Sequence, residues 1–73
     1  MTSERAEEIY TTYHRGYNYI VKDKIKVREL AMTCAIKSVV DNIPNNREYY
    51  MPILDELYTM CEYMNINIKK EKV

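Results

Sequence analysis

The stretch from Asn42 to Glu48 constrains this chain most, because it is the strongest break in a sequence that otherwise has helical character throughout. Pro44 cannot continue a helix and biases the residue before it toward extended backbone. The two asparagines that follow tolerate turn conformations, and Asn46 can accept a hydrogen bond from a free amide of the next helix. The pattern therefore predicts a turn over 42–46 between two helices arranged as an antiparallel hairpin.

The sequence after the turn predicts a helix over about 46–67 that presents an apolar seam. Pro52 interrupts this helix and is expected to kink or delay it, and the charged tail 69–73 is expected to fray. The seam has heptad-like spacing and comprises Tyr50, Leu54, Leu57, Cys61, Met64 and Ile68. Counting back through the turn pairs Leu57 with Met32, Leu54 with Ala35, Ile53 with Ile36, and Tyr50 with Val39.

Two further helices are predicted before the turn, over about 3–22 and 25–42. The second has apolar residues on more than one side and so requires two neighbours. The first has Thr2 or Ser3 as its cap, and a bend at Lys22–Lys24 separates the two. Its apolar stripe consists of Ala6, Ile9, Tyr10, Tyr13, Tyr17 and Ile20. The expected fold is a single all-α domain, a helical hairpin plus an N-terminal helix, assembled into an oligomeric bundle.

Oligomerisation is expected because a chain of 73 residues buries only about 60% of its unfolded surface. A disulfide is not expected to help. In the predicted hairpin Cys61 lies a rise of roughly 9 Å beyond the level of Cys34, and a disulfide joins Cα atoms less than roughly 7 Å apart. Both thiols are predicted to be reduced core residues. No signal peptide or membrane span is evident, so a soluble cytoplasmic protein is expected.

Catalysis and metal binding have little support in the sequence. His14 is the only histidine and Gly16 the only glycine, which excludes a glycine-rich phosphate loop and leaves no metal-ligand spacing. Lysine plus arginine equal aspartate plus glutamate at eleven each, which disfavours general nucleic-acid or membrane binding. We therefore expect neither an enzyme nor a cofactor.

The best binding signal is the stretch from Tyr10 to Arg28, where tyrosines interleave with basic residues. Aromatic rings stack on bases and cations pair with phosphates. The competing interpretation is that the tyrosines are core or interface residues, or reflect compositional drift, and that the lysines form a solvated face. Arg47 beside the free amides of a helix start likewise suits either phosphate binding or a surface ion pair.

The run Ile43-Pro44-Asn45-Asn46-Arg47-Glu48 resembles the helical-hairpin domain of phage anti-CBASS and anti-Thoeris cyclic-nucleotide sponges. That domain typically reads Leu-Pro-x-Ser-Arg-Glu between its helices, and the resemblance covers about Val27 to Ile68. The chain departs from the family pattern at several points: Ile43 replaces leucine, Asn46 replaces serine, Pro52 is foreign, Glu56 and Leu57 are shifted by one position, and the usual tryptophan is absent.

The resemblance implies a homo-oligomeric viral protein in the host cytoplasm. It would bind cyclic di- or trinucleotide messengers at subunit interfaces and sequester them without cleavage. The positions that match the family turn are Pro44, Asn46, Arg47 and Glu48. The family also uses a tyrosine and a lysine, for which Tyr10 or Tyr13 and Lys24 or Lys26 are the candidates by position.

A small helical interaction module that inhibits or adapts a partner protein, such as a host protein, is the alternative function. Exposed methionine and tyrosine at helical spacing would serve either role.

Overall fold

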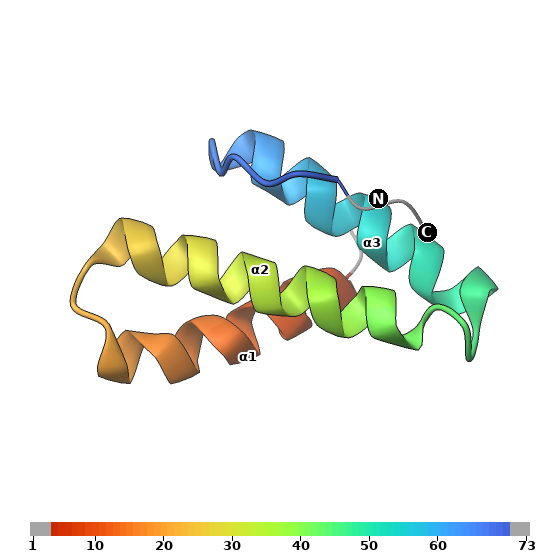
Figure 1. Ribbon diagram of the computed structural model, residues 1–73, viewed down its shortest axis with the longest axis horizontal. Coiled ribbons are helices and arrows are strands. Elements are labelled where there is room, and N and C mark those ends of the chain that lie inside the picture. The colour runs from red at the N-terminus through yellow and green to blue at the C-terminus, as the bar shows by residue number, and fades with distance from the viewer. Residues whose placement is uncertain (1–3, 71–73) are drawn as a thin grey trace.

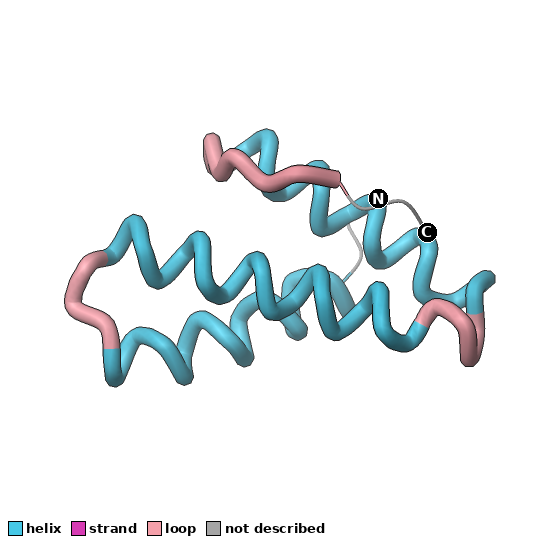
Figure 2. Tube along the Cα trace, viewed as in Figure 1, coloured by secondary structure: helices cyan, strands magenta, loops and turns pink. Residues whose placement is uncertain are grey.

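The computed structural model describes residues 4–70, which form three helices and no strand (Figures 1 and 2). Helix α1 spans Glu4–Ile20, α2 spans Lys24–Asn42 and α3 spans Arg47–Tyr63. The predicted all-α class is confirmed. The expected cap at Thr2 or Ser3 lies outside the described residues. Within residues 4–70, no helix has the length and apolar character needed to cross a membrane.

The break between α1 and α2 falls at residues 21–23, where the sequence predicts a bend. Asp23 explains why α2 begins there. Its backbone is extended, and its carboxylate accepts hydrogen bonds from the amides of Ile25 (3.0 Å) and Lys26 (3.4 Å). An aspartate at this position satisfies helix-start amides that would otherwise lack partners.

The turn at residues 43–46 is held by backbone hydrogen bonds and by the predicted cap. The Asn45 amide donates to the Asn42 carbonyl at 3.0 Å. The side-chain oxygen of Asn46 accepts from the Tyr49 amide at 3.2 Å. Helix α3 starts at Arg47, upstream of Pro52, and continues through it to Tyr63, so Pro52 does not delay the helix.

Helix α3 ends at Tyr63 and not near residue 67, so the end predicted for this helix is wrong. Asn65 adopts a left-handed backbone with φ of 55°. Its amide donates to the Glu62 carbonyl (3.3 Å), and the Ile66 amide donates to the Cys61 carbonyl (2.9 Å). These two bonds define a Schellman motif, in which the apolar residue after the left-handed position packs back on the helix. Ile66 is buried accordingly.

The core lies around α2, which packs against both α1 and α3, while α1 also touches α3. This arrangement explains why α2 has apolar residues on more than one side. The seven aliphatic members of the predicted register pairs and Cys61 are all buried in one cluster, and Tyr50 packs against it. The most deeply buried large side chains are Met32, Leu54, Leu57, Val27 and Val39.

Helix α1 is only weakly buried. Ala6 is its one buried residue, whereas Ile9, Tyr10 and Tyr13 pack against the core from its edge. Ile20 was expected on the apolar stripe but is 80% exposed. It lies at the last turn of α1, at the end of the molecule that carries the 21–23 loop (Figure 1).

Both cysteines are free thiols. Cys61 is buried, and this burial raises the pKa of its thiol. Cys34 is only half-buried and shares a hydrogen bond of 3.0 Å with the Tyr17 hydroxyl, so the prediction of a core thiol holds for Cys61 and only in part for Cys34. The bond to Cys34 is the main reason that the pKa of Tyr17 is raised.

Candidate functional site

A groove with a volume of about 550 Å³ lies where the middle of α1, the first half of α2 and the end of α3 meet. We call it the tyrosine–arginine groove. Its lining residues are Tyr10, Thr11, His14, Arg28, Tyr63, Met64 and Asn65. Three of them, Tyr10, His14 and Arg28, belong to the stretch of interleaved aromatic and basic residues in the sequence.

Tyr10 and His14 lie one helical turn apart on α1, which places them on the same face. Their ring centroids are 5.7 Å apart and the rings are inclined by 42°. Partial burial raises the pKa of the Tyr10 hydroxyl, and the nearby Arg28 guanidinium opposes that shift. The hydroxyl therefore stays protonated at neutral pH and can donate a hydrogen bond into the groove.

The end of α3 supplies the opposite wall. Because the left-handed residue Asn65 stops the helix, Tyr63, Met64 and Asn65 reach the groove from the last turn and the cap. The side chain of Tyr63 is 87% exposed, so its ring is accessible to a ligand. A helix that continued to residue 67, as the sequence predicts, would give this wall a different backbone.

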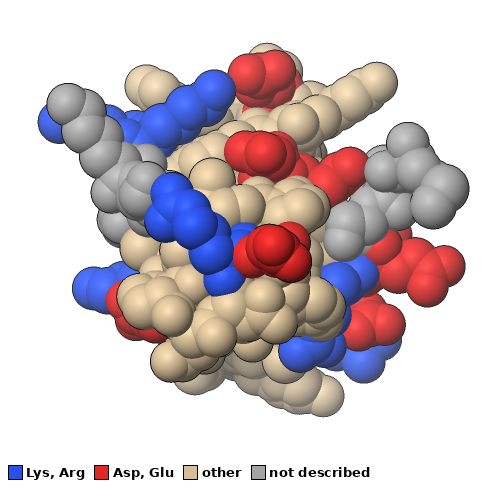
Figure 3. Space-filling model, turned by 90° about the vertical axis from the view of Figure 1, so that its right-hand side faces the viewer, with Lys and Arg blue, Asp and Glu red and all other residues tan. Residues whose placement is uncertain are grey.

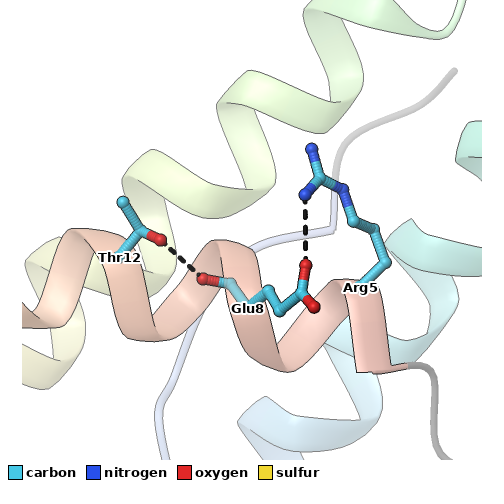
Figure 4. Close-up of polar contacts among 3 residues, drawn as sticks. All are labelled: Arg5, Glu8 and Thr12. Carbon is cyan, nitrogen blue, oxygen red and sulfur yellow. Dashed lines mark hydrogen bonds and ion pairs between the residues drawn. The ribbon is translucent and has the colours of Figure 1, made fainter.

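The groove differs chemically from the larger depression beside it. That depression, of about 880 Å³, is lined in part by Glu4, Glu7 and Glu8. Figure 4 shows that Arg5 there pairs with Glu8 at 3.2 Å, while Thr12 donates to the Glu8 carbonyl. None of the described residues that line the tyrosine–arginine groove is a carboxylate. Aromatic faces with a guanidinium and an imidazole suit a planar, anionic ligand.

The remaining sequence-predicted site residues do not join this groove. Tyr13 lies on another flank of α1, where it lines depressions with Ser38. Lys24 and Lys26 are exposed at the start of α2. Arg47 and Glu48 are exposed at the start of α3, next to the cap Asn46.

The lysines at the start of α2 lie far from the polar residues at the start of α3 within a single chain. The rise along α2 separates Lys24 from the 43–46 turn by roughly 27 Å, and Figure 1 shows these segments at opposite ends of α2. Figure 3 views the end that carries the turn, where basic and acidic side chains are interspersed. The predicted site residues therefore fall into four places: Tyr10 in the tyrosine–arginine groove, Tyr13 on another flank of α1, Lys24 and Lys26 at the start of α2, and Asn46, Arg47 and Glu48 at the start of α3.

Of the seven residues that line this groove, sequence reasoning selects only Tyr10 as a site residue. His14 and Arg28 stand inside the interleaved stretch and face the same groove as Tyr10 because α1 packs on α2. Asn65 has a detectable signal, since asparagine is the residue other than glycine that most readily takes a left-handed cap. Tyr63 has none, because its place depends on where α3 ends.

Comparison of the chain with protein-family models, with curated proteins and with solved structures gives no match. Among residues 4–70, no group of three or more histidine, cysteine, aspartate or glutamate side chains is arranged to hold a metal ion. The chemistry of the tyrosine–arginine groove is therefore the basis on which a function can be inferred.

Proposed function

We propose that this protein binds a cyclic di- or trinucleotide in the tyrosine–arginine groove and sequesters it without cleaving it. The observation that supports the proposal is that Tyr10, His14, Arg28 and Tyr63, contributed by three helices, line the same groove. The resemblance of the 43–48 turn to phage anti-CBASS sponges extends the proposal to a viral anti-defence role in the host cytoplasm. Lowering the free messenger would keep the host effector inactive.

In this proposal the nucleotide is recognised by stacking of its bases and by pairing of its phosphates with a charged side chain. A base stacks against the exposed Tyr63 ring or the partly buried Tyr10 ring, an interaction worth about 1–3 kcal/mol per base. The Arg28 guanidinium pairs with a phosphate through charge-assisted hydrogen bonds. His14 adds an imidazole N–H donor.

The lining of the same groove supports the proposal of retention without cleavage. Its described lining has one imidazole and no carboxylate, so the acid–base pair that commonly assists hydrolysis is not assembled there. The reaction class best suited to the groove is reversible binding.

Lys24, Lys26, Asn46, Arg47 and Glu48 remain proposed contacts for the ligand. Within one chain, the two lysines at the start of α2 lie roughly the length of α2 away from the three residues at the start of α3. One nucleotide would contact both only where two copies of the chain meet. The proposal therefore includes a homo-oligomer.

Isothermal titration of purified protein with a panel of cyclic di- and trinucleotides tests the proposal, with linear nucleotides as controls. We expect saturable binding of a cyclic species that is returned intact after heat release. Arg28→Ala is expected to weaken binding by about tenfold or more, because a charge-assisted hydrogen bond is worth about 1.5–3 kcal/mol. Arg15→Ala, an exposed arginine on α1 outside this groove, is the matched control. Absence of heat with every nucleotide would refute the proposal.

The alternative function, a helical module that inhibits or adapts a partner protein, is favoured by a different observation. Tyr19, Ile20 and Ile25 are 94%, 80% and 70% exposed around the 21–23 loop. Apolar side chains gathered at one end of a molecule are typical of an interaction site. On this alternative Arg28→Ala would be silent and Ile25→Ser would abolish capture of the partner.

A further inference from the structure

The zero net charge that disfavours general membrane binding conceals an uneven distribution of charge along the chain. Residues 11–28 contain five basic residues and one acidic residue. The rest of the chain therefore carries an equal excess of negative charge. A strongly basic segment within a neutral protein indicates a surface for an anionic partner.

The middle of this basic segment lies at one extremity of the molecule, which carries the 21–23 loop (Figure 1). We call residues 19–26 the lysine–isoleucine tip. All of its cations are exposed: Lys22, Lys24 and Lys26. Its one carboxylate, that of Asp23, accepts hydrogen bonds from two amides at the start of α2, where the positive end of the helix dipole offsets its charge. The tip therefore presents net positive charge to its surroundings.

The same tip exposes large apolar side chains. Tyr19, Ile20 and Ile25 are each at least 70% exposed. An aliphatic side chain in water lacks the stabilisation that burial would supply. Tyrosine has an apolar ring and a polar hydroxyl, which suits the boundary between the headgroups and the acyl chains of a bilayer. Apolar side chains beside lysines are the combination that binds at this boundary.

Other occupants fit this combination less well. A second copy docked tip to tip would bring its own lysines against these lysines, and like charges facing one another destabilise an interface. A nucleic acid would pair with the lysines but would give Ile20 and Ile25 no role, since bases stack on aromatic faces. An anionic bilayer satisfies both groups, because it has phosphates at its surface and hydrocarbon beneath them.

We propose that the lysine–isoleucine tip docks on the surface of an anionic lipid bilayer. Ile20 and Ile25 enter the boundary between headgroups and acyl chains, and the lysines pair with headgroup phosphates. Lysine suits this position because its aliphatic stem lies against apolar groups while its ammonium group reaches the phosphates. The protein lies on the bilayer and does not cross it.

This docking is independent of the proposed function. The tip shares no residue with the lining of the tyrosine–arginine groove. Lys24 and Lys26, which the proposed function assigns to a nucleotide, would pair with the phosphate of either ligand. Ile20 and Lys22 belong to the tip alone, so variants at these two positions carry the test.

Co-sedimentation with lipid vesicles in the absence of nucleotide tests the charged part of the tip. We expect the chain to bind vesicles of phosphatidylglycerol and phosphatidylcholine more tightly than vesicles of phosphatidylcholine alone, and added salt to weaken the binding. Lys22→Gln should weaken it about fivefold, which is the contribution of one lysine near an anionic surface. Lys37→Gln is the matched control, because Lys37 is exposed on α2 outside the tip. Its binding should equal that of the wild type.

The apolar part of the tip is tested in the same assay. Ile20→Ser should weaken vesicle binding about tenfold or more, whereas Ile20→Leu keeps an apolar side chain and should bind as the wild type does. Because Ile20 is 80% exposed, neither change should alter the Tm, which circular dichroism checks.

Three results would overturn the proposal: no binding to anionic vesicles, equal binding to neutral ones, or binding that Ile20→Ser leaves unchanged. If vesicles are not bound and Ile25→Ser abolishes capture of a partner protein, the tip is a protein-interaction site. Nucleotide titration is carried out without lipid, so either proposal can fail alone.

Discussion

Asn65, which ends α3, gives a prediction for both the sign and the size of the change in the free energy of unfolding. Asn65 holds φ at 55°, a region that costs an ordinary L-residue roughly 1–2 kcal/mol. Asparagine tolerates it better, and glycine adopts it without penalty. Asn65→Gly is therefore expected to raise the free energy of unfolding by about 0.5–1 kcal/mol, and Asn65→Ala to lower it by about 1 kcal/mol.

These differences are large for a domain of this size. Each 1 kcal/mol shifts Tm by about 4–8 °C for 60–100 residues, so a gap of about 1.5–2 kcal/mol separates the two variants by roughly 6–16 °C. Thermal unfolding followed by far-ultraviolet circular dichroism measures the gap. Asn67→Gly and Asn67→Ala are the matched controls, because Asn67 is exposed and follows the cap.

The opposite order would refute the reasoning. If α3 continued through residue 65 as a regular helix, alanine would be the more stabilising residue there, by about 1 kcal/mol over glycine. Asn65→Ala melting above Asn65→Gly would thus show that the left-handed cap does not form. It would also change the backbone of Asn65, the residue through which the cap of α3 lines the tyrosine–arginine groove.

Three further predictions concern the core, a cap and a thiol. Leu57→Ala should lower the free energy of unfolding in urea by about 2–5 kcal/mol and Leu57→Met by less than about 1.5 kcal/mol, because Leu57 is fully buried. Asp23→Ala should cost about 0.5–2 kcal/mol in the same assay, whereas Asp23→Asn keeps the capping oxygen and most of the stability. Burial raises the pKa of the Cys61 thiol in the folded chain. The contribution of this thiol to the free energy of unfolding should therefore be fully present below the ordinary thiol pKa and be lost as the pH rises through the raised pKa. Urea titrations of Cys61→Ala at several pH values should lack this decrease.

The helical parts of the fold follow from local signals. Pro44 and Asn46 act within a few residues of themselves, so the turn and the start of α3 could be read from them without knowledge of the rest of the chain. The apolar period in 25–42 likewise predicts a helix with two neighbours, and α2 has them. The helical period predicts an α3 that is too long, because the period continues through Asn65, which is the left-handed cap in the structure.

The candidate site was less predictable. The interleaved stretch pointed to Tyr10, and the structure adds His14 and Arg28 from the same stretch. The stretch cannot tell which of its residues share a face across two helices. Tyr63 joins them from a segment about 50 residues away in the sequence, through packing alone.

The sequence by itself determined that this protein is helical, that its chain turns near 21–23 and 43–46, and which apolar residues of α2 and α3 form most of the core. Capping, proline geometry and helical period act over a few residues, so these features need no knowledge of the rest of the chain. Only the tertiary structure decided that Ile20 would be exposed and that α1, α2 and the cap of α3 would enclose one groove. Those outcomes depend on how far each helix extends and how the helices cross, which are set by side-chain packing between segments distant in the sequence.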